Sequence, residues 1–97
     1  MTGKTDSSPS TFLKKVKITN ETGLHTRAAA IIAKIAQNAK SKIWISKESE
    51  MVDASSIIDI LTLECTKGSW ITLISENPAD HHLLLRIQES VESGFGE

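Results

Sequence analysis

The residues best suited to chemistry are His25 and Arg27, which lie close together in the run Gly23-Leu24-His25-Thr26-Arg27-Ala28-Ala29-Ala30. A strand and a short polar turn are expected before this run, and an alanine-rich helix is expected to start at the histidine. The first turn of a helix offers unpaired backbone N–H groups and the positive end of the helix dipole. An anion bound there would meet a nucleophilic imidazole nitrogen and a guanidinium. This arrangement suits a phosphoryl group carried on His25.

Length, charge and cysteine content limit the class of protein. A chain of 97 residues makes one domain with a modest core, too small for a cofactor-binding cleft between two lobes. Its net charge of −1 argues against nucleic acid or a membrane surface as the main partner. The single cysteine, Cys65, excludes an internal disulfide and fits a reducing cytosol. The sequence shows neither an apolar run long enough for a membrane span nor the apolar core of a signal peptide.

The hydrophobic pattern divides the chain into a polar tail and a folded domain. Residues 1–11 are polar and rich in Ser and Thr, and they are predicted to form a flexible tail before a domain at 12–97. Alternating apolar residues predict strands at 16–19, 43–45, 51–53 and 70–73. Helical spacing predicts helices that begin at His25, at Ser56 and at Pro78, with Asn77 as the cap of the last one.

The order of these elements, β-α-β-β-α-β-α, predicts the fold class. Short connections favour a four-stranded antiparallel sheet, so we expect an α/β (α+β) open-faced sandwich with all helices packed on one face. The first helix should bury one stripe of apolar residues. These residues are Ala28, Ile31, Ile32, Ile35 and Ala39.

Ser56 is predicted to cap the second helix. Ser56-Ile57-Ile58-Asp59 has the form of a capping box, with Asp in place of the usual Glu or Gln. Such a cap is worth about 1 kcal/mol. Ser55 is the alternative cap, but it lacks an acidic residue three positions on.

These features resemble the HPr family, the histidine-containing phosphocarriers of the bacterial phosphotransferase system. The resemblance covers residues 12–97 and centres on Gly23-Leu24-His25-Thr26-Arg27, which matches the family signature G-[LIM]-H-[AT]-R. It continues at Ser55-Ser56-Ile57-Ile58, Lys67-Gly68 and Ser93-Gly94-Phe95. Residues 16–20, residues 63–68 and the Ser-Gly-Phe run resemble the nitrogen-related branch, often called NPr.

The resemblance implies an HPr-like fold and a role in phosphoryl transfer. His25 would accept phosphate from Enzyme I, itself charged by phosphoenolpyruvate, and pass it to an Enzyme IIA-type acceptor. Arg27 would neutralise the phosphate oxygens, and Thr26, Ile57 and Ile58 would contact the partner proteins. Such a carrier completes no turnover alone and needs no metal or organic cofactor. We expect it to be a cytoplasmic monomer.

Ser56 matches the serine that HPr kinase/phosphorylase modifies in some bacteria. A phosphate on Ser56 would again lie at a helix N-terminus and would change the choice of partner without unfolding the domain; simple capping is the other interpretation. Two positions depart from the family pattern. Ala28 stands where relatives usually have proline, which should loosen the first helical turn. Asp59 stands where many have glycine or lysine, and it adds a carboxylate near Ser56.

The remaining prominent side chains favour structural interpretations. Adjacent histidines, His81 and His82, point about 100° apart on a helix and cannot chelate one metal together. Alternation along their strands places Trp44 and Trp70 on the open face of the sheet. The second and fourth strands are neighbours in the family's sheet, so we expect the two indoles to cover each other and nearby lysine stems. The alternative is a second docking or self-association face.

Two further functions stay open at this point. The first is an HPr-like regulatory protein that signals by its phosphorylation state without sugar transport. The second is a nucleic-acid-binding sandwich, which would need a basic, aromatic sheet face. Trp44 and Trp70 supply the aromatic rings, but the charge balance opposes this second function.

Overall fold

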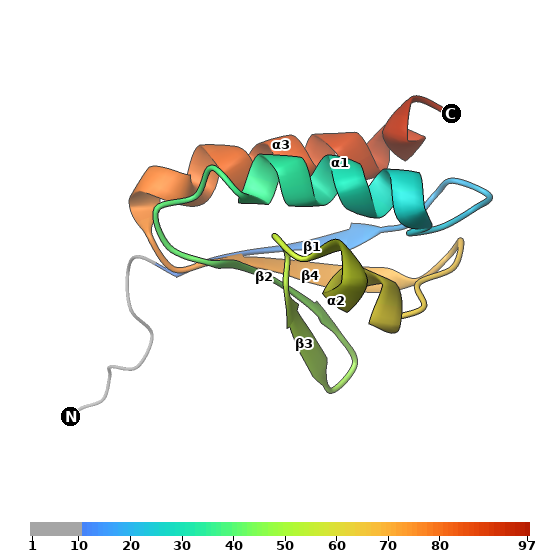
Figure 1. The fold of residues 1–97 in the computed structure, drawn as a ribbon, viewed down its shortest axis with the longest axis horizontal. Coiled ribbons are helices and arrows are strands. Elements are labelled where there is room, and N and C mark those ends of the chain that lie inside the picture. Colours follow the sequence, from blue (N-terminus) through green and yellow to red (C-terminus); the bar gives the residue numbers. More distant parts are fainter. Residues whose placement is uncertain (1–10) are drawn as a thin grey trace.

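The computed structural model describes residues 11–97, and Figure 1 shows their arrangement. The strands are β1 (Phe12–Lys17), β2 (Ile43–Lys47), β3 (Glu50–Asp53) and β4 (Trp70–Ser75). The helices are α1 (Thr26–Ala36), α2 (Ile57–Thr62) and α3 (His81–Glu92), with 3-10 turns η2 (Pro78–Asp80) and η3 (Gly94–Gly96) flanking α3. The predicted order of elements is confirmed. Except for Thr11, the predicted tail at 1–11 lies outside the described residues.

All four strands pair antiparallel in one sheet, in the order β1-β4-β2-β3. Figure 1 shows α1 and α3 side by side over one face of this sheet, while α2 packs against α1 and β3. The predicted open-faced sandwich is therefore confirmed. Within residues 11–97, none of the helices has the length and apolar character that crossing a membrane requires.

The first strand starts earlier than the sequence pattern predicts. The alternation of apolar residues indicates a strand at 16–19, whereas β1 begins at Phe12. Backbone pairing with β4 holds this segment, and backbone hydrogen bonds leave no alternating signal in the side chains. Pairing also continues beyond β1, because the N–H of Ile18 donates to the carbonyl of Ser69 at 2.8 Å and its carbonyl accepts from Gly68 N–H at 2.8 Å.

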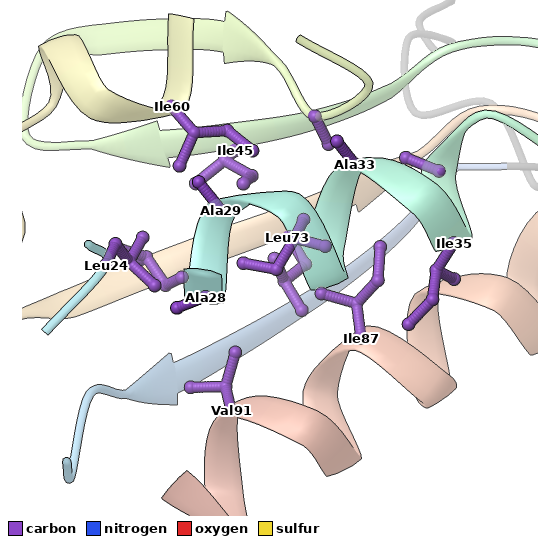
Figure 2. Packing of buried hydrophobic residues seen from close by; sticks show 14 of the residues in the cluster. Leu24, Ala28, Ala29, Ala33, Ile35, Ile45, Ile60, Leu73, Ile87 and Val91 are labelled. Carbon is purple, nitrogen blue, oxygen red and sulfur yellow. The ribbon is translucent and has the colours of Figure 1, made fainter. Parts of the chain in front are cut away.

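The hydrophobic core fills the space between the helices and the sheet. Strand alternation directs one set of apolar side chains inward, and α3 adds an apolar stripe of its own, as Figure 2 shows in part. These fully buried residues are Ile43, Ile45, Ile71, Leu73, Leu84, Ile87 and Val91. Each such side chain stabilises the fold by about 1.5–3 kcal/mol relative to its exposed state.

The buried face of α1 is broader than the predicted stripe. Ala28, Ile32 and Ile35 are buried as expected, but Ile31 is only partly buried, and Ala39, also partly buried, lies beyond the end of α1. Alanines take the additional buried positions, namely Ala29, Ala33 and Ala36. The reason is that α1 contacts both α2 and α3, so small side chains on several of its sides are enclosed.

The expected contact between the two tryptophans is wrong. Trp44 pairs with Ile74 across β2 and β4, whereas Trp70 pairs with Lys17 across β4 and β1. Trp70 thus lies four residues along β4 from the partner of Trp44, about 13 Å at the usual rise of a strand. The other part of the expectation is confirmed, because lysines lie near both rings. Lys15 Nζ lies 5.5 Å from the Trp70 ring centroid, and Lys42 Nζ lies 5.9 Å from that of Trp44.

Candidate functional site

A tight turn anchors the backbone immediately before His25. Gly23 has a φ of 64°, and a Cβ at this position would lie 2.3 Å from the carbonyl oxygen of Cys65. Leu24 donates its N–H to that same oxygen at 3.0 Å, and its side chain is buried. Only glycine fits this left-handed, closely approached position. The signature glycine therefore fixes where the following histidine is presented.

His25 is the N-cap of α1, one residue before the helix proper. Its backbone is extended, and its carbonyl accepts the N–H of Ala29 at 2.8 Å. Its imidazole makes no capping hydrogen bond, and the first turn contains no acidic residue. The first N–H groups of a helix have no intrahelical partner. This end of α1 therefore keeps its positive character beside the imidazole.

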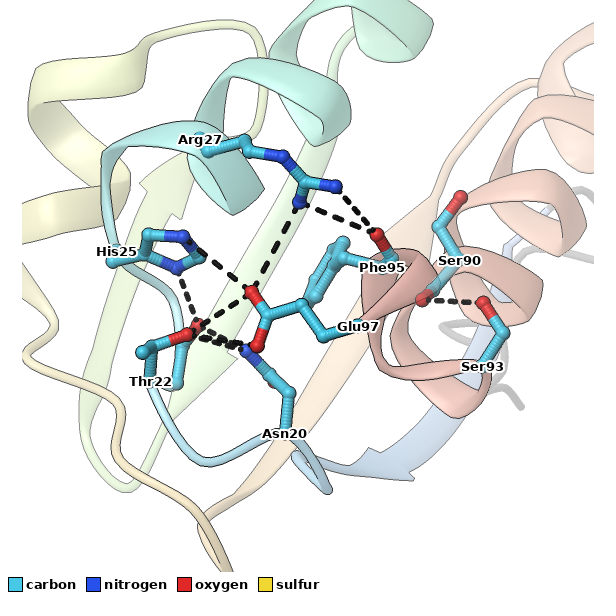
Figure 3. A network of polar contacts seen from close by, with 9 residues as sticks. Asn20, Thr22, His25, Arg27, Ser90, Ser93, Phe95 and Glu97 are labelled. Atoms are coloured by element: carbon cyan, nitrogen blue, oxygen red, sulfur yellow. Dashed lines mark hydrogen bonds and ion pairs between the residues drawn. The ribbon is translucent and has the colours of Figure 1, made fainter.

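Polar side chains from distant parts of the chain converge on one carboxylate, that of Glu97 (Figure 3). Its Oε2 lies 3.5 Å from His25 Nε2 and 3.9 Å from Arg27 Nη1. The hydroxyl of Thr22 lies 3.1 Å from both carboxylate oxygens. The guanidinium of Arg27 also donates to the carbonyl of Phe95, at 3.3 and 3.1 Å. The histidine and arginine of the sequence motif thus share one anion.

Asn20 organises the turn beneath this network. Its side-chain amide donates to the carbonyl of Gly23 at 2.9 Å and to the hydroxyl of Thr22 at 3.1 Å. The Gly23 carbonyl also lies 3.2 Å from Nδ1 of His25. Sequence reasoning missed Asn20, Thr22 and Glu97. Asn20 carries only the signal of a turn residue, and no sequence signal connects Glu97 to a residue that lies 75 positions away.

The three predicted docking residues have different exposures. Thr26 is exposed at the first helical position of α1, Ile57 is partly buried and Ile58 is 74% exposed. Ile60 turns into the core (Figure 2) and is fully buried. Residues 58 and 60 lie about 200° apart around a helix, so Ile58 must point away from the core. A large aliphatic side chain of α2 is therefore left in solvent.

Ser56 is the N-cap of α2, as predicted. Its Oγ accepts the N–H of Asp59 at 3.2 Å. The reciprocal half of the capping box does not form, because the N–H of Ser56 donates to the carbonyl of Asp53 at 3.2 Å. The alternative cap, Ser55, instead donates its hydroxyl to the Asp53 carboxylate at 2.7 Å.

Cys65 and the histidine pair have structural surroundings. Cys65 is buried, and burial raises the pKa of its thiol while the nearby charge of Lys47 partly opposes that rise. The sequence alone does not show that Lys47 lies near Cys65. The His81 ring lies 4.5 Å, centroid to centroid, from that of Phe12. Among residues 11–97, the structure gathers no three His, Cys, Asp or Glu side chains as metal ligands.

Comparisons with known proteins point to one family. The family model described as "PTS HPr component phosphorylation site" matches residues 13–93. The phosphocarrier protein HPr of Cupriavidus necator is 32% identical over 80 residues, which cover 82% of this chain and 90% of that protein. The HPr-like protein Crh of Halalkalibacterium halodurans is 40% identical over 63 residues, 65% of this chain and 75% of that protein.

A solved structure has the same fold and a related sequence. HPr from Thermoanaerobacter tengcongensis superposes with a TM-score of 0.83 at 32% identity. The match covers 89% of this chain and 97% of that one. A family match across most of the domain, together with this fold, decides the classification. The chain belongs to the HPr family of phosphocarrier proteins.

Proposed function

We propose that this protein accepts a phosphoryl group from Enzyme I on His25 and passes it to an Enzyme IIA-type acceptor. The observation that supports this proposal most directly is the convergence of His25 and Arg27 on one anion at the uncapped end of α1. A carboxylate and a phosphoryl group are both anionic oxygen acceptors. Donors arranged around the first therefore suit the second.

In the proposed transfer, a ring nitrogen of His25 attacks the phosphorus atom of the donor. A nitrogen–phosphorus bond forms, the bond from phosphorus to the donor breaks, and the donor keeps that electron pair. Transfer of this kind depends on positioning and on neutralising the phosphoryl oxygens. Arg27 and the first N–H groups of α1 would supply that neutralisation.

The same groups would allow the phosphoryl group to leave again. The Arg27 side chain is 56% exposed, and a helix dipole contributes only about 0.3–1 kcal/mol at an exposed site. Phosphohistidine would therefore be stabilised modestly. A carrier needs this balance, because it must give up its phosphoryl group to the next protein.

The test is intact mass spectrometry after incubation with Enzyme I and phosphoenolpyruvate. The wild type should gain one phosphoryl group on an acid-labile, base-stable adduct, and His25→Ala should gain none while remaining folded. His82→Ala is the matched control, since His82 is an exposed histidine on α3. Equal labelling of His25→Ala, or no labelling of the wild type by a competent Enzyme I, would refute the carrier function.

We further infer that Thr26, Ile57 and Ile58 contact Enzyme I and the acceptor. The exposure of Ile58 supports this, because a solvated aliphatic side chain is a natural interface anchor. Ser56 is proposed as a regulatory site for HPr kinase/phosphorylase, supported by its place at the N-terminus of α2. The cytoplasmic location, the monomeric state and the nitrogen-related branch stay predictions from the sequence.

A regulatory protein is the second candidate function. Structural similarity to Crh, the catabolite repression HPr of Bacillus subtilis, supports it, and the position of His25 in the anion site supports the carrier. Transfer of the phosphoryl group to an acceptor distinguishes the carrier from the regulatory protein. A carrier labelled on His25 should lose its phosphoryl group within minutes when an Enzyme IIA-type acceptor is added, whereas a pure regulator should keep it.

A further inference from the structure

The face of the sheet opposite the helices carries large apolar side chains in solvent. Figure 1 shows α1 and α3 over one face of the sheet, and strand alternation directs Leu13, Met51 and Trp70 to the other face. Their exposed fractions are 57%, 56% and 52%. Within residues 11–97, these are three of the five exposed large hydrophobic side chains. Apolar residues that gather on one face in this way indicate an interaction surface.

The register between strands joins these side chains into one surface, which we call the open face. Leu13 and Trp44 both pair with Ile74, so an apolar row crosses β1, β4 and β2. Trp70 lies four residues along β4 from Ile74, about 13 Å away. Met51 extends the surface onto β3, which lies three strand spacings, about 14 Å, from β1.

Two lysines give the β1 side of the open face a positive charge. Alternation directs Lys15 and Lys17 to this face, and their Nζ atoms lie 5.5 and 6.0 Å from the centroid of the Trp70 ring. Within residues 11–97, neither lysine makes an ion pair. Among the strand residues, Asp53 is the one carboxylate directed to this face, and Lys42 Nζ already holds it at 2.8 Å. The β1 side therefore keeps two uncompensated positive charges, although the chain as a whole has a net charge of −1.

These charges select the chemical class of the partner. Single-stranded nucleic acid stacks its bases on open aromatic rings, whereas lysine ammonium groups lie over the Trp70 ring. An acidic polypeptide fits the surface better. Its carboxylates would pair with Lys15 and Lys17, and its apolar side chains would cover Leu13 and Trp70.

A short amphipathic helix has the dimensions of the open face. About nine helical residues span 13 Å, and a helix with its side chains is about 10 Å wide. Helices already pack on the other face of the same sheet, and sheets with helices on both faces form a common layered architecture. A surface of this size is smaller than that of a permanent complex, so the partner should bind transiently.

We propose that the open face binds an acidic amphipathic helix of a partner protein, with the carboxylates of that helix along β1 and its apolar side chains over Leu13 and Trp70. The α1 helix, which begins after His25, packs on the opposite face of the sheet. The partner can therefore stay bound while His25 reacts. This inference does not rest on the proposed phosphocarrier function.

The test is an NMR titration of the isotopically labelled full chain with a helical peptide of about 15 residues. The peptide carries leucines on one face and glutamates along one flank. We expect a Kd of about 100 µM, as for a transient complex, with the largest shift changes at Leu13, at Lys15 and at the indole N–H of Trp70. The same peptide with lysines in place of the glutamates is the control and should bind at least about tenfold more weakly.

A charge exchange locates the contact on β1. The double variant Lys15→Glu, Lys17→Glu should weaken binding of the acidic peptide by about tenfold and strengthen binding of the lysine peptide by a similar factor. The double variant Lys34→Glu, Lys40→Glu changes the net charge equally at exposed lysines outside the open face. It should leave both affinities within about twofold of the wild type. Trp70→Ala should weaken binding of the acidic peptide by about tenfold.

Several results would overturn the proposal. These are no binding at millimolar peptide, equal binding of the two peptides, equal effects of the two double variants, and shift changes confined to α1 and α2. Tighter binding of an oligouridylate would make the open face a nucleic-acid surface instead, and dimerisation through the same residues would make it a contact between two copies. The bound peptide should leave phosphorylation of His25 by Enzyme I within about twofold of the free rate. Failure of the peptide-free protein to take phosphate would refute only the carrier function.

Discussion

The N-termini of α1 and α2 differ in whether a side chain caps their unpaired N–H groups. In α1, the N-cap His25 makes no side-chain hydrogen bond, and the first turn carries no acidic residue. In α2, the N-cap Ser56 accepts the N–H of Asp59, and Asp59 itself adds a negative charge to the first turn. A carboxylate in that position compensates the helix dipole. The N-terminus of α2 is thus capped by its own side chains. The N-terminus of α1 is left open to bind an anion from elsewhere.

This difference predicts different purposes for the two proposed phosphate positions. An anion at His25 meets donors that nothing in α1 satisfies, so it can bind and leave without disturbing the helix. A phosphate on Ser56 would have to replace the capping hydrogen bond and lie near the Asp59 carboxylate. The first arrangement suits rapid exchange of a phosphoryl group. The second suits a slower modification that an enzyme adds and removes.

The largest expected effect is on Gly23, which presents the open end of α1. Gly23→Ala should destabilise the protein by more than about 3 kcal/mol, because strain at positive φ is joined by a clash with the Cys65 carbonyl. Gly68→Ala is the matched control, since Gly68 has a φ of 93° but open space around a Cβ. It should cost only the strain, about 1–3 kcal/mol. Urea denaturation measures both, and equal losses would contradict the clash.

The second prediction separates docking from chemistry. Ile58→Ala should weaken the apparent affinity for Enzyme I by about tenfold, the loss expected when an apolar anchor of roughly 1.4 kcal/mol is removed. Leu85→Ala is the control, because Leu85 is another exposed aliphatic residue, 44% exposed, on α3. Titration of Enzyme I in the phosphorylation assay gives both affinities. Equal weakening by the two variants would remove α2 from the docking surface.

The third prediction compares how the two N-cap residues, Ser56 and His25, contribute to stability and to phosphorylation. Ser56→Ala should cost about 1 kcal/mol of stability, because it removes the cap of α2, and should leave labelling of His25 unchanged. His25→Ala should do the reverse, since His25 caps nothing with its side chain.

A charged variant of Ser56 then isolates the effect of charge. Ser56→Asp keeps a good capping side chain, so a rate of phosphorylation by Enzyme I that falls a few-fold would report charge on the docking surface. Denaturation midpoints and initial labelling rates cover all three variants. If Ser56→Asp and phosphorylated Ser56 both transfer at the wild-type rate, Ser56 is only a cap.

Local patterns in the sequence predicted the parts of the site that local physics determines. The cap at Ser56 needs only a serine and a backbone N–H three residues on. The inward direction of Ile43 and Ile45 follows from strand alternation alone. Each of these features depends on residues within one turn or one strand, and the structure contains each of them.

Features that depend on the register between strands, or on contacts between segments distant in the sequence, could not be predicted in this way. Trp44 and Trp70 lie on neighbouring strands, but the offset between the strands separates the rings, and alternation carries no information about offset. The approach of Glu97 to Thr22 and His25 depends on how α3 and η3 pack across the molecule. The broad buried face of α1 likewise reflects two neighbouring helices rather than its own periodicity.

The smallest expected effect concerns acid stability beside the capped end of α2. Asp53 accepts hydrogen bonds from Lys42 Nζ and from the N–H of Ser55, both at 2.8 Å. The hydrogen bond from Lys42, helped by Ser55 and opposed by desolvation, lowers the pKa of Asp53 from 3.8 to about 2.

A carboxylate whose pKa is lower in the folded state stabilises the protein fully above its unfolded pKa, and this contribution is lost as pH falls through the folded value. The melting temperature of the wild type should therefore fall more steeply than that of Asp53→Asn between about pH 4 and pH 2. Glu89→Gln removes an exposed carboxylate from α3 and should keep the wild-type slope. Parallel curves for the wild type and Asp53→Asn would mean that the ion pair between Asp53 and Lys42 does not hold the loop before Ser56.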